Sequence, residues 1–587
     1  MNIAKTQPVR LASIVARIVM IVVLTGCGQQ TPMQVTPAAD HVFINGGVYT
    51  VNSEQPWVDA VAIQGERIAW LGASADAVQW IGPQTRVTDL TGRMLLPGFG
   101  DSHLHMLYGG RVVSACLLDQ HTDPQAIAER LLECSERFSF AGSDWIFGSR
   151  WARWSFPDGT PPATFLDDLF PDRPVVIEAS DGHSAWANRV AMDRSGINLG
   201  TPDPVGGVIE RDPVSGRASG LLHESAMQIV YDAMPAEGLE DQLGYIRTAQ
   251  DMALQFGITA AIEPGMNLDQ ARLFSYLEES GALKMRVLIA LTPLGMEIKA
   301  FDEGIFRTTA RRSEVEGGRV SAHSVKVFVD GVIENGTAPL QEPYLKESIQ
   351  PLEPFYPPET LKDYFIRLDR EGISIHVHAI GDRGIKETLD AFEAMREANG
   401  ESDSRHLVTH LQLIDPVDIG RFRELGIVAS FSTLWAYPEE YNTQIYPPLV
   451  GQDRVERFYP VGSVNAAGGM IAIGSDWSID EMDPFLAIEV ALTRQNPFTD
   501  SGPALNVGER IDLDTALRAY TFNVAYAMGL EREVGSIEVG KRADLVVLDR
   551  NLFEIPAYSI SEANALLTMI DGKVVFERAA LSGSGEG

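Results

Sequence analysis

The central part of the chain alternates short apolar runs with longer amphipathic stretches. The apolar runs are 94–102, 256–263, 285–292, 323–330, 373–380, 406–412, 427–432 and 470–475. A short apolar run bounded by helical stretches is typical of a parallel strand that is buried on both faces. These eight runs match the number of strands in a closed (β/α)8 barrel. The pattern therefore predicts an α/β protein whose main domain is a TIM-like barrel over residues 94–534.

Two β-rich segments flank this central part. Residues 41–93 and 535–580 consist of short apolar runs separated by turn signals such as Asn45-Gly46. Turn residues between runs of this kind indicate antiparallel hairpins. We expect the two segments to combine, so that both termini form one small β-sandwich domain.

The interval between the first apolar run and the second is far longer than the single helix that a barrel needs there. We assign about residues 112–245 to a large insertion after barrel strand 1. We expect it to lie over the barrel mouth, where it would supply a lid and contacts to a substrate.

The first residues are typical of an exported protein. A basic segment precedes the apolar run 18–24, which is too short to cross a membrane as a mature helix. The run ends in Leu24-Thr25-Gly26-Cys27, which resembles the bacterial lipobox. This resemblance implies a signal peptide over 1–26, a lipid on Cys27, a linker over 27–40 and a location on the periplasmic side of the cell envelope, at the outer membrane in a Gram-negative organism. The alternative is an ordinary secretory signal with a chance cysteine.

Composition limits the partners. The chain carries 80 acidic and 47 basic side chains, a formal net charge of −33. Nucleic acids and anionic membrane surfaces require a positive face, so we expect neither, and a lipid on Cys27 is the only membrane contact that we expect. Cys116 and Cys134 are the other cysteines. An oxidising compartment allows a disulfide between them, and two separate buried thiols are the alternative.

Side chains with metal-binding or catalytic chemistry fall at the ends of five predicted strands. They are His103 and His105 after the first run, Lys326 in the fourth, His376 and His378 in the fifth, His410 in the sixth and Asp476 after the eighth. The carboxyl ends of barrel strands meet at one face of the barrel, so we expect these side chains to converge. Histidines at positions i and i+2 of a strand point the same way, and imidazole is a favoured zinc ligand.

Each of these residues also has a structural interpretation. A strand histidine is often a packed core residue, Lys326 could extend to solvent, and Asp476 could cap a helix. All of these alternatives would have to hold together at five strand ends. If Lys326 instead carries a carboxylate through carbamylation, it becomes an anionic bridge between two cations. His376 lies one layer deeper than His378, so we assign it a structural or supporting role.

The motifs resemble those of a known family. Leu96-Pro97-Gly98-Phe99 before Asp101-Ser102-His103-Leu104-His105, with the late Gly540-Lys541-Arg542-Ala543-Asp544, resembles the amidohydrolase superfamily. The segments 181–188, 325–331 and 378–383 narrow the resemblance to its amidohydrolase 3 branch, which includes YtcJ-like and N-substituted formamide deformylase-like proteins. The resemblance covers about residues 41–580.

The resemblance implies an enzyme that cleaves an amide-type C–N bond of a small molecule with metal-activated water. Asp476 would be the proton shuttle, and one or two divalent ions, zinc foremost, would be held by the set His103, His105, Lys326, His378 and His410. His183 of the insertion is a second catalytic candidate, although it could simply satisfy local backbone. Trp477 and Arg383 are candidates for substrate binding.

Two rival functions remain open from the sequence. The same groups could attack an ester, a lactone or a carbamate. A non-catalytic solute-binding lipoprotein is the alternative from another class, but it would have no need for His103, His105 and Asp476 together. A homodimer is a further expectation, because barrels of this kind often pair.

Overall fold

The computed structural model describes residues 38–118, 123–137, 140–152, 155–156, 161–162, 164–180, 182–204, 207–292, 304–347, 349, 352–499 and 501–579. The predicted signal peptide, Cys27 and most of the predicted linker lie outside these residues. Among the helices so described, none combines the length and the apolar character needed to cross a membrane.

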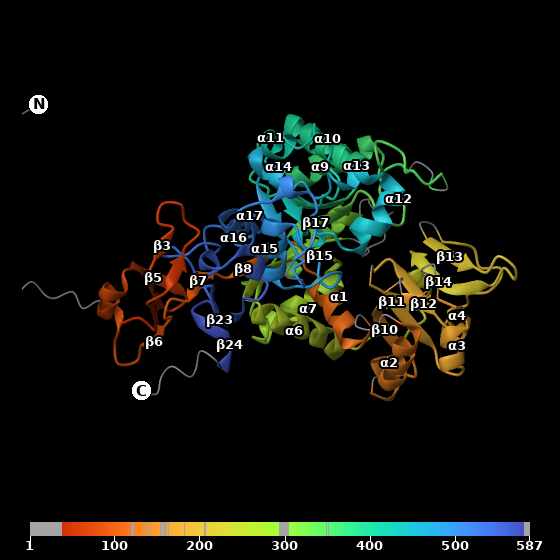
Figure 1. Ribbon diagram of the computed structural model, residues 1–587, viewed down its shortest axis with the longest axis horizontal. Coiled ribbons are helices and arrows are strands. Elements are labelled where there is room, and N and C mark those ends of the chain that lie inside the picture. The colour runs from red at the N-terminus through yellow and green to blue at the C-terminus, as the bar shows by residue number, and fades with distance from the viewer. Residues whose placement is uncertain are drawn as a thin grey trace, which may run out of the picture. The chain divides into compact units, whose positions relative to one another are not determined.

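The centre of the chain is an eight-stranded sheet in the order β21-β20-β19-β18-β17-β16-β15-β8, and every neighbouring pair is parallel (Figure 1). Its strands in chain order are β8 (Phe99–Asp101), β15 (Ile258–Met266), β16 (Arg286–Leu291), β17 (Val320–Phe328), β18 (Ser374–Ala379), β19 (Leu407–His410), β20 (Val428–Phe431) and β21 (Ile471–Ile473). The Ser102 amide donates to the carbonyl of Ile473 at 3.1 Å and so links the first strand to the last. Each predicted apolar run overlaps one of these strands, and the predicted barrel is confirmed.

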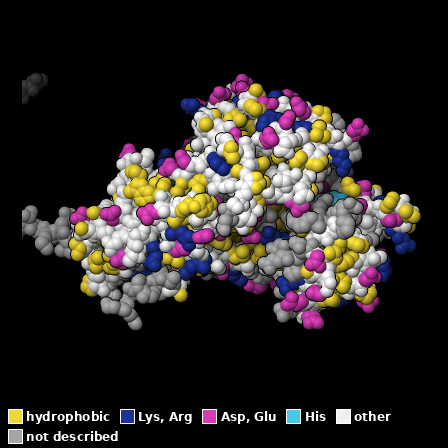
Figure 2. Space-filling model, viewed as in Figure 1, with side chains coloured by type: hydrophobic (Ala, Val, Ile, Leu, Met, Phe, Trp, Pro, Cys, Tyr) yellow, Lys and Arg dark blue, Asp and Glu magenta, His cyan; other side chains and the backbone are white. Residues whose placement is uncertain are grey.

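Helices follow the strands and cover the outside of the barrel, where Figure 2 shows both acidic and basic side chains on the outer surface. They are α1 (Met106–Ser114), α6 (Leu239–Gln255), α7 (Leu268–Glu279), α8 (Gly304–Thr309), α9 (Pro358–Arg370), α10 (Asp382–Asn399), α11 (Arg421–Leu425), α12 (Tyr446–Val450), α13 (Gln452–Val455), α14 (Val461–Ala466), α15 (Pro484–Thr493), α16 (Leu513–Ala519) and α17 (Phe522–Ala527). Local sequence sets the helix ends: Asn267 caps α7 and forms a capping box with Gln270. Val524 and Ala527 of α17 pack with Leu288 and Leu407 in the barrel interior and close its base.

Both ends of the chain build the neighbouring domain. One sheet has the order β5-β4-β1-β6 and the other the order β24-β23-β22-β7-β2-β3. The strands are β1 (His41–Ile44), β2 (Gly47–Tyr49), β3 (Trp57–Val58), β4 (Ala60–Gln64), β5 (Arg67–Gly72), β6 (Arg86–Asp89), β7 (Met94–Pro97), β22 (Leu545–Leu548), β23 (Ala565–Ile570) and β24 (Lys573–Glu577). Figure 1 shows the red and the blue strands side by side. Phe43 and Val61 pack against Leu95 and Leu567 between the sheets, which confirms the predicted sandwich.

The structure divides the run 94–102, which the sequence assigned to one barrel strand. β7 pairs with β2 and β22 in the terminal domain, and only β8 enters the barrel. The chain turns between them at Gly98, where a Cβ atom would lie 2.4 Å from the Thr259 side chain. Both sheets bury apolar strands, so the hydrophobic pattern could not show where one ends and the other begins.

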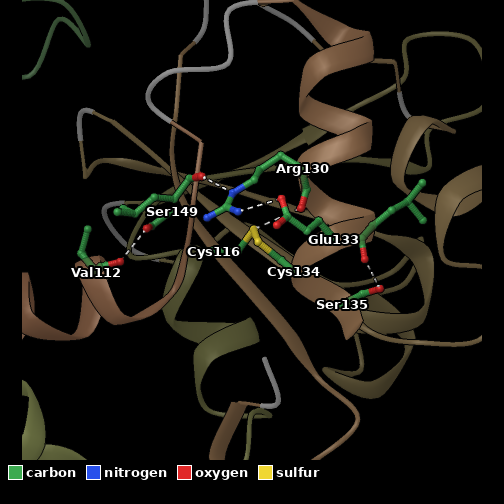
Figure 3. The surroundings of a disulfide bond; sticks show 9 residues. Val112, Cys116, Arg130, Glu133, Cys134, Ser135 and Ser149 are labelled. Atoms are coloured by element: carbon green, nitrogen blue, oxygen red, sulfur yellow. Dashed lines mark hydrogen bonds and ion pairs between the residues drawn. A yellow bond between two sulfur atoms is a disulfide. The ribbon is translucent and has the colours of Figure 1, made fainter. Parts of the chain in front are cut away.

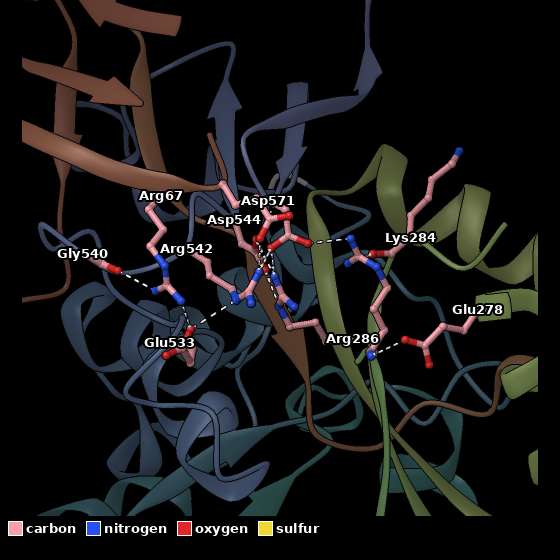
Figure 4. Close-up of polar contacts among 11 residues, drawn as sticks. Arg67, Glu278, Lys284, Arg286, Glu533, Gly540, Arg542, Asp544 and Asp571 are labelled. Carbon is pink, nitrogen blue, oxygen red and sulfur yellow. Dashed lines mark hydrogen bonds and ion pairs between the residues drawn. The ribbon is translucent and has the colours of Figure 1, made fainter. Parts of the chain in front are cut away.

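A buried ion-pair network joins the base of the barrel to the terminal domain (Figure 4). Arg286 at the start of β16 donates from Nε to Asp544 at 2.7 Å and from Nη2 to Asp571 at 2.5 Å. Arg319 and Arg542 also donate to Asp571, at 2.5 and 2.7 Å. We call Arg286, Asp544, Asp571, Arg319 and Arg542 the base network.

The insertion after β8 has a sheet of its own in the order β13-β14-β12-β11-β10-β9. Its elements are β9 (Cys116–Leu117), α2 (Pro124–Arg137), β10 (Ile146–Trp151), α3 (Phe165–Leu169), β11 (Val175–Ala179), β12 (Ser184–Ala187), α4 (Arg189–Arg194), β13 (Gly207–Arg211), β14 (Ala218–Glu224) and α5 (Met227–Tyr231). A disulfide between Cys116 and Cys134 fastens α2 to β9 (Figure 3). Of the two alternatives that the sequence left open, a disulfide and two separate thiols, the structure has the disulfide.

Candidate metal centre and active site

His103, His105 and Asp476 converge at the mouth of the barrel. The Nε2 atoms of His103 and His105 lie 3.4 and 3.2 Å from Oδ1 of Asp476. One ligand atom from each of the three residues falls within 4.8 Å of the others. In the described part of the chain this is the one group of three or more His, Cys, Asp or Glu side chains with that spacing.

The other predicted histidines surround this group. The Nδ1 atom of His410 lies 3.8 Å from Oδ2 of Asp476 and, although buried, has no hydrogen-bond partner. The ring centroid of His378 lies 4.4 Å from that of His410, and its Nε2 donates to the carbonyl of Gly331 at 3.2 Å. A histidine whose outer nitrogen is held by a backbone carbonyl is oriented to offer its inner nitrogen to a metal.

His376 contacts a predicted ligand rather than the centre itself. Its Nε2 lies 2.7 Å from Nδ1 of His103. With the proton on Nδ1 of His103, this hydrogen bond directs the lone pair of His103 Nε2 toward Asp476; the tautomer is our assignment. The geometry agrees with the supporting role that the sequence suggested for His376.

Lys326 lies inside the barrel, beside His376 of the neighbouring strand in the β17–β18 register. The side chain is 1% exposed, and Nζ lies 4.8 Å from the ring centroid of Phe328. Burial lowers the pKa of Lys326 to about 7, and the Asp476 carboxylate opposes that shift. A large fraction of this amine is therefore neutral near pH 7.

Four histidines at the centre are held neutral. Burial, and after it mainly the charges of Lys326 and neighbouring histidines, place the pKa values of His103, His376, His378 and His410 well below the usual value. Neutral imidazole is the form that binds metals. Nitrogen donors with one carboxylate are the ligand set of zinc-type sites, and the orphaned nitrogen of His410 shows a buried position that lacks a partner. The residues present therefore fit a divalent metal ion.

Two buried carboxyl groups hold this arrangement in place, and sequence reasoning missed both roles. Asp101 accepts hydrogen bonds from the amides of His103 at 2.9 Å and Ser475 at 3.1 Å, so it joins the two segments that carry His103 and Asp476. Asp330 accepts from the amides of Ile380 and Gly381. Burial raises the pKa of Asp101 to about 7 and that of Asp330 to about 8. Asp101 ends the apolar strand β8, and Asp330 follows the apolar strand β17. An acidic residue at such a position is the signal in the sequence from which these roles could have been predicted.

The insertion brings His183 toward the same mouth. A Cβ atom at Gly182 would lie 3.0 Å from Ile479, three residues after Asp476, and 3.5 Å from the Tyr108 hydroxyl. Nδ1 of His183 lies 3.0 Å from Oε2 of Glu224. The turn that carries His183 is thus seated on the segments that follow His105 and Asp476.

The two predicted substrate-binding residues lie in different surroundings. Trp477 is buried, its carbonyl accepts from the His105 amide at 3.0 Å, and a Cβ atom at Gly109 would lie 2.3 Å from its ring. Arg383 begins α10, where Nε donates to Glu387 at 3.1 Å and Nη2 donates to Glu353. Together with Lys362 it lines an outer groove of about 490 Å³. The structure therefore packs Trp477 beside the centre and does not bring Arg383 there; the roles of both in substrate binding stay predictions.

Comparison with known proteins identifies the family of the chain. The sequence profile described as the amidohydrolase family (Amidohydro_3) matches residues 86–576. Protein LONG AFTER FAR-RED 3 of Arabidopsis thaliana is 29% identical over 92% of each chain. N-substituted formamide deformylase of Arthrobacter pascens is 28% identical over 92% of this chain and 99% of its own.

A solved structure shares the fold. It is that of an uncharacterized metal-dependent hydrolase from Pyrococcus horikoshii, with a TM-score of 0.70 and 22% identity over 88% of this chain and 99% of that one. The profile match spans the barrel and the strands β6, β7, β22, β23 and β24 of the terminal domain, and the family resemblance that the motifs indicated is confirmed. The chain belongs to the amidohydrolase family of metal-dependent hydrolases.

Proposed function

We propose that the protein hydrolyses an amide-type C–N bond of a small molecule. The observation that carries this proposal is the meeting of His103, His105 and Asp476, from opposite ends of the barrel sequence, at one buried point of the mouth. The similarity to a relative named N-substituted formamide deformylase supports an amide substrate over other carbonyl compounds.

His103, His105, His378 and His410 would hold a divalent ion, with zinc the first candidate because the donors are imidazole nitrogens. When bound, such an ion lowers the pKa of a water molecule and polarises a carbonyl group. We propose one or two ions, with Lys326 as a carbamate in the two-ion form. The neutral amine of Lys326 can add carbon dioxide and release a proton, and the lowered pKa of this amine favours that reaction.

The chain's own residues would move the protons. As water oxygen bonds to the carbonyl carbon, a carboxylate oxygen of Asp476 accepts the proton that the water loses. As the C–N bond breaks, Asp476 returns that proton to the departing nitrogen, and a neutral amine leaves. His183 of the insertion would contact the carbonyl or the departing group, and Trp477 would form a wall of the site.

A matched pair of substrates and a metal analysis test this proposal. The purified protein is analysed for zinc and other divalent metals, and is then given a panel of N-acyl amides together with the esters of the same acyl groups. Bound metal and turnover of an amide are expected. A protein that cleaves only the esters would be an esterase on the same site, whereas one that binds the compounds without turnover and without metal would be a solute-binding protein.

We further propose that the protein is exported and anchored through a lipid on Cys27. The lipobox-like segment supports this, and so does the Cys116–Cys134 disulfide, because disulfides persist mainly in oxidising compartments. The Cys27→Ser variant is expected to move from the membrane fraction to the soluble fraction and to lose incorporation of labelled palmitate. Equal membrane association of both forms would contradict the anchor.

A further inference from the structure

The carboxylate of Glu224 connects the insertion to the barrel. Glu224 ends β14, and its Oε2 lies 3.0 Å from Nδ1 of His183. Its other oxygen, Oε1, accepts from the side-chain amide of Asn335 at 3.2 Å. Asn335 belongs to the barrel, in the segment that follows the strand of Lys326. One carboxylate therefore holds a histidine of the insertion and an amide of the barrel at once.

His183 is positioned on the side of the insertion that meets the metal centre. Its neighbour Gly182 lies against Tyr108 and Ile479, and the ring of Tyr108 is 6.3 Å from that of His105. The side chains of His183 and Glu224 are each 26% exposed, so the pair is partly shielded from water.

A second pair of the same kind lies on the same sheet and offers an internal comparison. Nε2 of His223 lies 3.4 Å from Oε2 of Glu210, and Nδ1 of His223 lies 3.1 Å from the Ser184 hydroxyl. Both Glu210 and Ser184 belong to the insertion. The two pairs thus share a residue combination and a sheet, but they differ in that the Glu224 carboxylate also holds a barrel residue.

We propose that Glu224 is a positioning residue: it holds the imidazole of His183 toward the reacting atoms, and its hydrogen bond to Asn335 fixes the pair against the barrel. This inference rests on the proposed function. A carboxylate that accepts from Nδ1–H fixes the tautomer and orientation of a histidine and keeps the lone pair on Nε2. Because Glu224 holds Asn335 with its second oxygen, separation of insertion and barrel releases one of the two restraints on this carboxylate.

Steady-state kinetics on the metal-loaded protein test the catalytic part of the proposal. Glu224→Ala is expected to lower kcat about 10–100-fold, the range for partners that orient a functional histidine, with a much smaller change in KM. Glu224→Gln, which keeps an oxygen acceptor for Nδ1–H, is expected to restore part of that loss. Asn335→Ala, which removes only the bond to the barrel, is expected to give a smaller loss than Glu224→Ala.

A double-mutant cycle separates positioning from a general structural role. If Glu224 acts through His183, adding Glu224→Ala to His183→Ala costs no further activity. The matched control Glu210→Ala is expected to leave kcat within about twofold of wild type, as for a contact outside the site. Equal losses from Glu224→Ala with and without His183, or an equal loss from Glu210→Ala, would overturn the proposal.

A labelling measurement follows the same contact without any substrate. Diethyl pyrocarbonate modifies exposed imidazole, and peptide mass spectrometry gives the rate at each histidine. Glu224→Ala is expected to raise the rate at His183 several-fold and leave His223 unchanged, and Glu210→Ala is expected to do the reverse. An unchanged rate at His183 in Glu224→Ala would overturn the proposal. A wild-type protein that cleaves no amide while His183 still responds would instead contradict the proposed function alone.

Discussion

The two ends of the barrel bury charge in opposite ways. At the base, Asp571 accepts from Arg286, Arg319 and Arg542, and Asp544 accepts from Arg286, so opposite charges meet directly. At the mouth, His103, His105 and His410 lie around the carboxylate of Asp476, and Nδ1 of His410 has no hydrogen-bond partner. The charges of the base are paired with one another, whereas the carboxylate of Asp476 at the mouth faces the neutral imidazoles of His103 and His410.

The difference shows what each end is for. Buried charges are normally paired or bind a metal, because leaving them alone in a low-dielectric interior costs free energy. The base network satisfies this rule within the protein and fastens the barrel to the terminal domain. At the mouth, a bound cation would supply a charge partner for the carboxylate of Asp476.

The largest expected effect is at the mouth, from Asp476→Asn. The variant keeps the shape of the side chain but removes the proton acceptor, so kcat should fall about 10²–10⁴-fold, the contribution of a general base. The metal content, measured by mass spectrometry, should stay that of wild type. Asp144→Asn, at an exposed ion pair with Arg194 in the insertion, serves as the control and should retain activity. Loss of metal from Asp476→Asn would make the aspartate primarily a ligand.

Arg286→Met, at the base of the barrel, should lower the stability of the protein without lowering its activity. It leaves Asp544 and Asp571 buried with fewer partners, and breaking a buried pair costs about 3–5 kcal/mol. The melting temperature should fall while kcat per folded molecule is kept. Arg67→Met removes an exposed pair with Glu533, with side chains 45% and 42% exposed, and should cost about 0–1 kcal/mol. If both variants melt alike, the base network does not stabilise the fold as its geometry indicates.

His376→Gln should have an intermediate effect on the mouth. It disturbs the hydrogen bond that orients His103, and loss of such a partner weakens metal affinity about 10–100-fold. Titration with a chelator gives the affinity directly. The same substitution at His406, which pairs with Asp369 between α9 and α10, should leave metal affinity unchanged. Unaltered affinity in His376→Gln would show that His103 needs no such support.

The smallest effect concerns pH. Glu263 in β15 accepts from the Met106 amide at the start of α1, and burial raises its pKa to about 8. The folded state then keeps a proton that the unfolded state releases, so this group lowers stability as pH rises from about 4.5 to 8. Glu263→Gln should flatten the pH dependence of the melting temperature over that window in metal-free protein.

Asp571 in the base network is expected to change stability with pH in the opposite direction to Glu263. Against the effect of burial, Arg286 and its neighbours lower the pKa of Asp571, so its contribution to stability is lost as pH falls below the usual range of a carboxyl. Asp571→Asn should therefore remove acid sensitivity, along with a large part of the stability at neutral pH. If Glu263→Gln and Asp571→Asn change the pH dependence of the melting temperature in the same way, the proposed electrostatic difference between the mouth and the base of the barrel is contradicted.

The spacing of apolar residues was sufficient to predict the strands of the barrel and the residues at their ends. The eight strands and the positions of His103, His378 and Asp476 at strand ends follow from apolar runs and from the rule that barrel strands end at one face. Periodicity could not show that Met94–Pro97 and Phe99–Asp101 are separate strands, because the strand of the terminal domain and the strand of the barrel are equally apolar. The contact between His183 and Glu224 depends on the pairing of β12 with β14, and cross-strand register of this kind is not written in either segment alone.

The position of β7 determines when the terminal domain can fold during synthesis of the chain. β7 lies between β2, near the start of the chain, and β22, near its end. Until the ribosome has made β22, one edge of β7 has no neighbour, and an open apolar edge invites association with other chains. The terminal domain can therefore be completed only after most of the chain has been synthesised.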